Sequence, residues 1–223
     1  MESVKVSNLK KVYNEKGMPV EALRGVDLSV EKGEFLALVG PSGSGKTTLL
    51  NLIGGLDRQT GGNIFIEGRE IAGLSSSELA ELRLRRIGFV FQEYNLIPVL
   101  TAIENVEYVM LLQGMREKER RERALALLKE VGLEGMENRR PRELSGGQQQ
   151  RVAVARAIVS EPAIILADEP TANLDSNTGA ALLELMRGLN ERKGITFIFS
   201  THDPMVMERA RRIVRLKDGA IVT

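Results

Sequence analysis

Eight consecutive residues, 40–47 (GPSGSGKT), constrain the fold of this chain more than any other feature. They follow a short apolar run, residues 35–39 (FLALV), of the kind found in buried parallel strands. They lead into residues 46–53, where leucine and isoleucine recur at helical spacing. A strand, a glycine-rich loop and a helix in this order match the pattern G-x-x-x-x-G-K-[ST] at every fixed position. The sequence therefore predicts a phosphate-binding loop.

The chemistry of such a loop depends on its backbone. Glycines let successive N–H groups surround a phosphate, and the N-terminus of the following helix adds partial positive charge. We expect Lys46 to bridge the β- and γ-phosphates of a nucleotide and the Thr47 hydroxyl to ligate Mg²⁺. A glycine-rich turn beside an ordinary lysine is the alternative, which the complete pattern disfavours. The candidate nucleotide-binding residues are Gly40, Pro41, Ser42, Gly43, Ser44, Gly45, Lys46, Thr47 and Thr48.

Strand and helix patterns alternate along much of the chain. Apolar runs at residues 163–166 and 195–199 predict buried strands, and residues 147–160 and 176–193 have helical patterns. This alternation predicts an α/β fold, a P-loop NTPase core with a mostly parallel sheet. The first thirty-odd residues alternate apolar and polar side chains, which predicts an antiparallel β subdomain at the N-terminus. Further short strands are expected at residues 64–66, 87–91, 213–216 and 220–222.

Residues 93–143 differ from the rest because they contain no strand pattern. Thr101 and Glu104 form a capping box at the start of one helix, and residues 116–131 predict a charged amphipathic helix. We therefore expect one domain over residues 1–223. Its nucleotide-binding core and β subdomain, about 1–92 and 144–223, are interrupted by an inserted α-helical subdomain at about 93–143.

The composition limits the possible partners. The chain has 31 Lys and Arg against 30 Asp and Glu, so it has no electrostatic footprint for nucleic acid. It has no cysteine and one histidine, which excludes disulfide scaffolds and multi-histidine metal centres. The longest uncharged stretch, residues 35–45, is far shorter than the roughly 20 residues of a membrane-spanning helix. We expect a cytoplasmic chain whose role at a membrane needs a separate partner.

A second motif, residues 164–169 (IILADE), is an apolar strand that ends in two acids. Ligands of open α/β sheets gather at the carboxyl ends of strands. We expect Asp168 to hold Mg²⁺ through its water shell and Glu169 to activate the attacking water. Acids at strand ends also cap helices, but the phosphate-binding loop favours the catalytic interpretation. Many kinases and GTPases share these two motifs.

The segment Leu144-Ser145-Gly146-Gly147-Gln148 narrows the choice among families with a phosphate-binding loop. It places a serine and two glycines at a helix N-terminus, which is a second anion site on the same chain. With this motif the sequence resembles the ATP-binding-cassette (ABC) ATPases over essentially its whole length. The resemblance implies that Ser145, Gly146, Gly147 and Gln148 close over ATP held by a second subunit. Two ATP molecules would then be sandwiched in a head-to-tail homodimer.

The resemblance assigns roles to four further residues. Gln92 is similar to the glutamine that approaches Mg²⁺ and the attacking water, and His202 to the histidine that contacts the γ-phosphate. Asp175 resembles an aspartate that crosses the dimer interface, and Tyr13 an aromatic residue that stacks on adenine. The plainer alternatives are a polar strand end at Gln92, a helix N-cap at Asp175 and simple packing of Tyr13. The implied cofactors are ATP and Mg²⁺, and the implied activity is ATP hydrolysis.

Five short segments resemble the lipoprotein-release and macrolide-export group, which includes LolD-, MacB- and FtsE-like proteins. The resemblance implies a transmembrane permease on a separate chain, a position at the inner face of the cell membrane, and residues 93–100 as the dock for the permease. Soluble non-transport ABC ATPases, cell-division ATPases and small-molecule kinases are the alternatives. The substrate and its direction of transport are not readable from these residues. The five segments are residues 54–57, 87–92, 95–98, 148–151 and 173–176.

Overall fold

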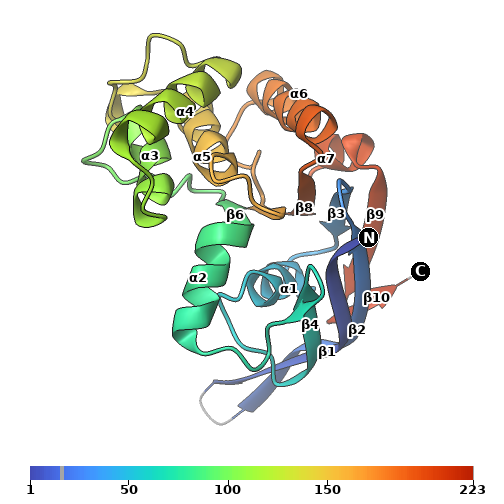
Figure 1. Cartoon of the computed structure of the whole chain (residues 1–223). Coiled ribbons are helices and arrows are strands. Elements are labelled where there is room, and N and C mark those ends of the chain that lie inside the picture. The colour runs from blue at the N-terminus through green and yellow to red at the C-terminus, as the bar shows by residue number, and fades with distance from the viewer. Residues whose placement is uncertain (16–17, 223) are drawn as a thin grey trace.

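Two β-sheets and the helices packed on them form the fold in the computed structural model, which describes residues 1–15 and 18–222 (Figure 1). The larger sheet has six strands in the order β10-β9-β3-β8-β7-β6. All neighbours are parallel except β10, which forms an antiparallel hairpin with β9. The predicted mostly parallel sheet is therefore confirmed. Its strands are β3 (Phe35–Val39), β6 (Ile87–Val90), β7 (Ile164–Asp168), β8 (Thr196–Thr201), β9 (Arg212–Lys217) and β10 (Ala220–Val222).

The smaller sheet has the order β2-β1-β4-β5, and its neighbouring strands are antiparallel. It contains β1 (Glu2–Glu15), β2 (Met18–Glu31), β4 (Gly61–Ile66) and β5 (Arg69–Glu70). Alternate residues of β1 are buried, as in Val4 and Val6, which is the pattern of a sheet with one face in the core. This sheet is the predicted antiparallel β subdomain.

Most helices begin at signals that are visible in the sequence. Thr101 and Glu104 form the expected capping box, and Asp175 accepts hydrogen bonds from two backbone N–H groups at the start of α6. Helix α2 was not predicted, although Ser75 and Glu78 form a capping box at its start. The α-helices are α1 (Lys46–Ile53), α2 (Ser76–Arg86), α3 (Ala102–Leu112), α4 (Glu117–Glu130), α5 (Gly146–Ile158), α6 (Ser176–Lys193) and α7 (Pro204–Arg209).

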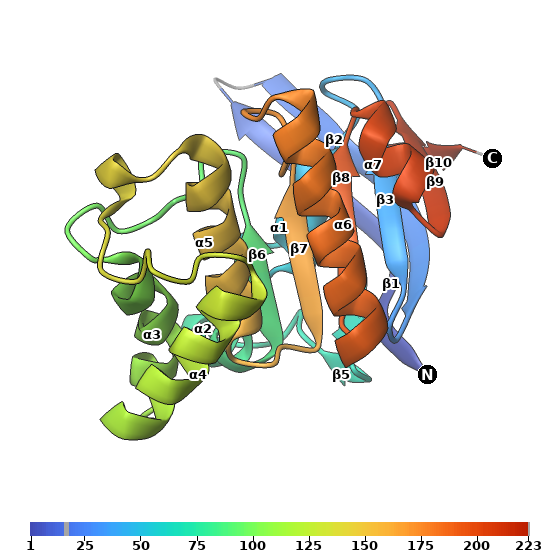
Figure 2. The ribbon, with the colours of Figure 1, turned by 90° about the horizontal axis from the view of Figure 1, so that it is seen from above.

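The larger sheet lies between two hydrophobic cores. Phe35, Ala37 and Val39 of β3 belong to the core beneath α5 and α6. Leu36 and Leu38 point the other way, into the core that α1 shares with the smaller sheet. Figure 2 shows α5 and α6 on one face of the sheet and α1 behind it. Because β3 is buried on both faces, the glycine-rich loop that follows it starts from a rigid position.

The chain between β6 and β7 passes through α3, α4 and α5, and α3 and α4 lie to one side of the larger sheet (Figures 1 and 2). Helix α5 packs closely on β6, because a Cβ at Gly88 would lie 2.3 Å from the carbonyl oxygen of Ala157. The division into a core and a helical insertion at residues 93 and 143 stays a prediction. Among the helices of residues 1–15 and 18–222, none is both long and apolar enough for a membrane span.

Candidate active site

Four loops meet at one edge of the larger sheet. The glycine-rich loop follows β3, Gln92 follows β6, Glu169 follows β7 and His202 follows β8. Since these four strands run parallel, their carboxyl ends open onto the same edge. A cavity of 550 Å³ lies there, lined by residues 41–48, the three side chains just named and Ala22. The structure thus brings the predicted phosphate-binding loop together with three of the predicted site residues.

Two glycines of this loop are required by its geometry. A Cβ at Gly40 would lie 2.2 Å from the carbonyl oxygen of Leu216, so any side chain would collide with the main chain of β9. Gly45 has a φ of 101°, a left-handed conformation that favours glycine, and it is the N-cap of α1. Because glycine has no side chain to cap the helix, the first N–H groups of α1 are left for a ligand, and an anion suits them best.

The charged and hydroxyl groups of the loop are also well placed. Lys46 is 8% exposed, and its Nζ donates to the carbonyl oxygens of Gly40 at 2.8 Å and Pro41 at 3.1 Å. The hydroxyl of Thr47 donates to Oδ1 of Asp168 at 3.2 Å. The lysine charge is therefore held against the loop, and a hydroxyl and a carboxylate converge beside it.

The Thr47–Asp168 pair fits Mg²⁺. This ion prefers oxygen ligands and binds to one or two carboxylates while keeping water and phosphate oxygens. Gln92 lines the same cavity and offers an amide oxygen. Across the two described ranges, no group of three or more acidic, histidine or cysteine side chains is arranged to hold a metal. An ion at this place would therefore need phosphate oxygens and water to complete its coordination.

Glu169 is held by two hydrogen bonds, one to each carboxylate oxygen. Nδ1 of His202 lies 2.6 Å from Oε1, and the hydroxyl of Thr201 donates to Oε2 at 3.0 Å. The backbone of Glu169 has a φ of 45°, a strained conformation for a residue with a side chain and one that clusters at functional sites. Thr201 was missed in the sequence, although it directly precedes His202 at the end of the same strand.

Gln150 is a second residue that the sequence did not single out. Its side chain is fully buried on α5, and Nε2 donates to the carbonyl oxygens of Phe91 at 3.2 Å and Pro170 at 2.7 Å. Phe91 precedes Gln92 and Pro170 follows Glu169, so Gln150 ties together two loops of the site. Its helical spacing from buried residues, at positions 153, 154 and 157, is the signal that could have found it.

Tyr13 lies outside the lining of the 550 Å³ cavity in the described part of the chain. Its hydroxyl donates to Oδ2 of Asp57 at 2.8 Å, and Nζ of Lys11 lies 4.6 Å from the ring centroid. Burial, together with the hydrogen bond to Asp57, raises the pKa of Tyr13. One face of the ring is therefore covered by an ammonium group, and an adenine ring would have to stack on the other face.

The Ser-Gly-Gly-Gln segment and Asp175 are also absent from that lining within the described ranges. Ser145 and Gln148 form a reciprocal capping box at the start of α5. Gly147 lies against α6, because a Cβ there would be 2.3 Å from a methyl group of Thr178. Asp175 caps α6, and its hydrogen bonds from Thr178, the side-chain one foremost, lower its pKa. The structure does not bring these residues to their own phosphate-binding loop.

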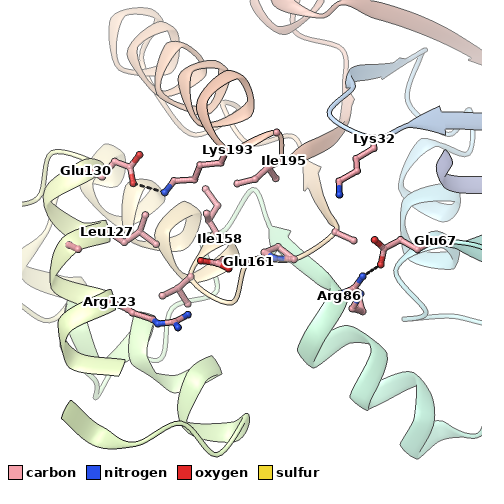
Figure 3. Close-up of a pocket in the computed structure, with 15 residues that line it drawn as sticks. Lys32, Glu67, Arg86, Arg123, Leu127, Glu130, Ile158, Glu161, Lys193 and Ile195 are labelled. Carbon is pink, nitrogen blue, oxygen red and sulfur yellow. Dashed lines mark hydrogen bonds and ion pairs between the residues drawn. The ribbon is translucent and has the colours of Figure 1, made fainter. Parts of the chain in front are cut away.

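Another cavity, of 530 Å³, opens at the opposite edge of the sheet, before the strands begin (Figure 3). Its charged groups are largely paired. Lys193 of α6 meets Glu130 of α4 at 3.2 Å, and Arg86 pairs with Glu67. It is separated from Glu169 and His202 by the length of the strands, and it does not share their chemistry. The cavity at the carboxyl edge is therefore the candidate nucleotide site.

Comparison with known proteins places this arrangement in context. A family model described as "ABC transporter" matches residues 23–172. An uncharacterised ABC transporter ATP-binding protein of Thermotoga maritima is 52% identical over 211 residues, which cover 95% of this chain and 90% of that protein. The lipoprotein-releasing system ATP-binding protein LolD of Syntrophus aciditrophicus is 46% identical over 220 residues, 99% of both chains. The macrolide export ATP-binding/permease protein MacB of Syntrophobacter fumaroxidans is 47% identical, but this chain corresponds to only 31% of its length.

Solved structures are similar over nearly the whole chain. A dimeric structure of the ATP-binding cassette MJ0796, in a post-hydrolysis state bound to ADP and Pi, is 47% identical and has a TM-score of 0.91. The alignment covers 99% of this chain and 97% of that one. The likeness is therefore one of sequence as well as of fold.

Proposed function

This chain belongs to the ABC transporter family as one of its ATP-binding proteins, and from that premise we propose that it works as a homodimer that hydrolyses ATP to drive a separate membrane permease. It is an ABC ATPase. The observation that carries the proposal is the convergence of the phosphate-binding loop, Gln92, Glu169 and His202 on one cavity. A loop that only bound phosphate would not need the acid and the imidazole beside it.

The reaction follows from these positions. Water attacks the γ-phosphorus, the bond to the bridging oxygen of ADP breaks, and inorganic phosphate leaves. Lys46 and the N–H groups of the loop hold the phosphates, and Glu169 accepts the proton of the water. Gln92 orients the water and His202 contacts the γ-phosphate. Mg²⁺, held by Thr47 and Asp168, would neutralise charge on the β- and γ-oxygens.

The dimer is proposed to be head-to-tail around two ATP molecules. The residues from Ser145 to Gln148 and Asp175 lie at helix N-termini outside their own cavity, where a second copy could present them to a nucleotide. Each cavity would then be completed by its partner. Tyr13 is proposed to stack its uncovered ring face on adenine.

A groove beside residues 93–100 is the proposed dock for the permease. It has a volume of 680 Å³ and lies between α2, α3, β6 and α5. Arg156 donates to the carbonyl oxygen of Tyr94 at 2.9 Å, so α5 holds the segment at the groove. Leu56 and Leu112 are exposed apolar side chains of its lining, and they suit an amphipathic cytoplasmic helix of the permease. The large apolar residues that line the groove are Leu56, Leu84, Ile87, Phe89, Phe91, Val109 and Leu112.

This dock adjoins the catalytic site, because Gln92 directly precedes residues 93–100 and lines the nucleotide cavity. A partner that moves the segment would move Gln92 with it. We place the protein at the inner face of the cell membrane, in the group that releases lipoproteins or exports macrolides or peptides. The similarity to LolD and MacB supports that group, and the permease would choose the substrate.

The test uses the purified protein. Lys46→Ala should abolish ATP hydrolysis, since the phosphates lose their main positive partner. Glu169→Gln should bind ATP without hydrolysing it and elute as a dimer in size-exclusion chromatography with ATP. A Glu169→Gln protein that stays monomeric at saturating ATP would contradict the sandwich, and unchanged turnover in Lys46→Ala would contradict the site.

A further inference from the structure

Glu169 has a buried neighbour that the proposed mechanism does not use. Thr201 is fully buried at the end of β8, and its hydroxyl donates to Oε2 of Glu169 at 3.0 Å. We propose that Thr201 is a positioning residue for ATP hydrolysis, which holds one carboxylate oxygen of Glu169 so that the other faces the attacking water. The inference rests on the proposed role of Glu169 as the base.

The direction of the Thr201 proton is set by its other neighbour. The backbone N–H of Asp203 donates to the Thr201 oxygen at 3.0 Å and occupies one of its lone pairs. A hydroxyl has a single proton to donate. With the amide of Asp203 on one side, that proton points at Oε2 of Glu169. The backbone of Asp203 therefore fixes the direction of the Thr201 hydroxyl proton.

Asp203 is itself held in place from two sides. Its Oδ1 accepts the backbone N–H of Met205 at 2.8 Å, as the N-cap of α7, and its Oδ2 accepts the hydroxyl of Thr171 at 2.6 Å. Thr171 is buried and follows Glu169 by two residues. The chain of contacts from Thr171 through Asp203 and Thr201 thus returns to the carboxylate and fixes it relative to its own loop.

The two hydrogen bonds of Glu169 differ in permanence. The side chain of His202, which meets Oε1 at 2.6 Å, is 73% exposed, so it can turn away towards a γ-phosphate. Thr201 cannot turn away, because it is enclosed by the protein. When His202 leaves Oε1, the bond from Thr201 is the contact that still orients the carboxylate. Without it the carboxylate could rotate about its last side-chain bond, and fewer encounters would place the base at the water.

The experiment compares variants of two neighbouring residues of β8 in the full chain. Thr201→Val keeps the shape and removes the hydroxyl, and it should lower kcat for ATP about 10- to 100-fold while leaving KM for ATP nearly unchanged. Thr201→Ser keeps the hydroxyl and should restore kcat to near the wild-type value. Ser200→Ala is the control, because the Ser200 hydroxyl is buried with no hydrogen-bond partner among the described residues. It should leave kcat unchanged.

Thr201→Val also leaves the amide of Asp203 unpaired, so each variant is checked by thermal unfolding. If the valine variant does not fold, Thr201→Cys replaces it, since a thiol is a weak donor, and the comparison with serine is the same. A wild-type kcat in the valine variant, or a serine variant as slow as the valine one, would overturn the proposal. In a Glu169→Gln background the valine change should have no further effect. Wild-type hydrolysis by Glu169→Gln alone would instead refute the proposed role of Glu169 as the base. This result therefore distinguishes a failure of the proposed function from a failure of the Thr201 proposal.

Discussion

Replacing Gln150 is predicted to destabilise the protein, because its one buried amide group donates hydrogen bonds to two loops of the site. Its Nε2 donates to the carbonyl oxygens of Phe91 and Pro170, at 3.2 and 2.7 Å. Gln150→Leu has a similar volume and removes both bonds. The buried carbonyl of Pro170 then loses the Gln150 amide as its donor, whereas the carbonyl of Phe91 still accepts the backbone N–H of Tyr94 at 3.3 Å. Each unsatisfied buried acceptor costs about 1–3 kcal/mol.

Part of that cost is recovered. Oε1 of Gln150 is buried with no hydrogen-bond partner in residues 1–15 and 18–222, so its removal relieves an existing penalty. Leucine also adds apolar surface to the α5 side of the core. We therefore expect Gln150→Leu to lower the free energy of unfolding by about 1–3 kcal/mol in total. For a chain of this length that corresponds to a fall in Tm of about 2–12 °C.

The assay is urea unfolding followed by circular dichroism, with ATPase turnover measured on the same samples. Turnover should fall as well, because the two carbonyls lie next to Gln92 and Glu169. Gln149→Leu is the matched control on the same helix, since its half-buried Nε2 donates to a single carbonyl, that of Leu144, at 3.1 Å. It should cost less than about 1 kcal/mol. An equal loss in both variants, or none in Gln150→Leu, would refute the reasoning.

Three further predictions follow from single contacts. Gly88→Ala should lower the free energy of unfolding by about 1–3 kcal/mol, because a Cβ there collides with the main chain of α5. Gly73→Ala should be nearly neutral in urea unfolding, because among the described residues a Cβ at Gly73 meets no neighbouring atom within 4 Å. Ser145→Arg should abolish hydrolysis but leave ATP binding to the monomer intact in equilibrium dialysis, and lost binding would mean that the segment acts on its own cavity. Burial opposes ionisation of Asp57, but the hydrogen bond from Lys11 leads the contacts that lower its pKa. The stability that this carboxylate contributes is present above its pKa in the unfolded chain and is lost as the pH falls through its pKa in the folded protein. The gap in Tm between wild type and Asp57→Asn should therefore narrow from pH 7 to pH 3. A constant gap would contradict the stabilising role of the ionised Asp57.

Local signals in the sequence were enough to predict a helix whose first and last residues are flanked by capping residues. Helix α6 was predicted over residues 176–193 and has those bounds, because Asp175 caps its start and Gly194, with a φ of 64°, ends it. Helix α2 has a capping box of the same kind but was missed. Its residues are mostly polar or charged, and only Leu79 and Leu82 are buried, so its apolar periodicity is weak.

The site was predictable for a different reason. Gln92, Glu169 and His202 are far apart in the chain, but each follows a strand, and parallel strands present their carboxyl ends together. The resemblance to ABC ATPases assigned roles to Gln92 and His202, and the assumption of one parallel sheet brings these residues, with Glu169, to the phosphate-binding loop. Gln150 could not be found in that way, because it binds main-chain carbonyls 59 and 20 residues away, and a carbonyl carries no sequence signal.

These contacts also explain how a signal from a partner could reach the bond that is broken. The proposed dock at residues 93–100 begins next to Gln92, and the carbonyl just before Gln92 shares the Gln150 amide with the carbonyl just after Glu169. A displacement of the dock therefore has two routes to the site, one through the chain to Gln92 and one through Gln150 to the loop of Glu169. Thr201 resists the second route, since it ties Glu169 to β8. If both contacts act, Gln150→Leu should weaken the response of hydrolysis to the permease more than it weakens basal hydrolysis, whereas Thr201→Val should lower both by the same factor.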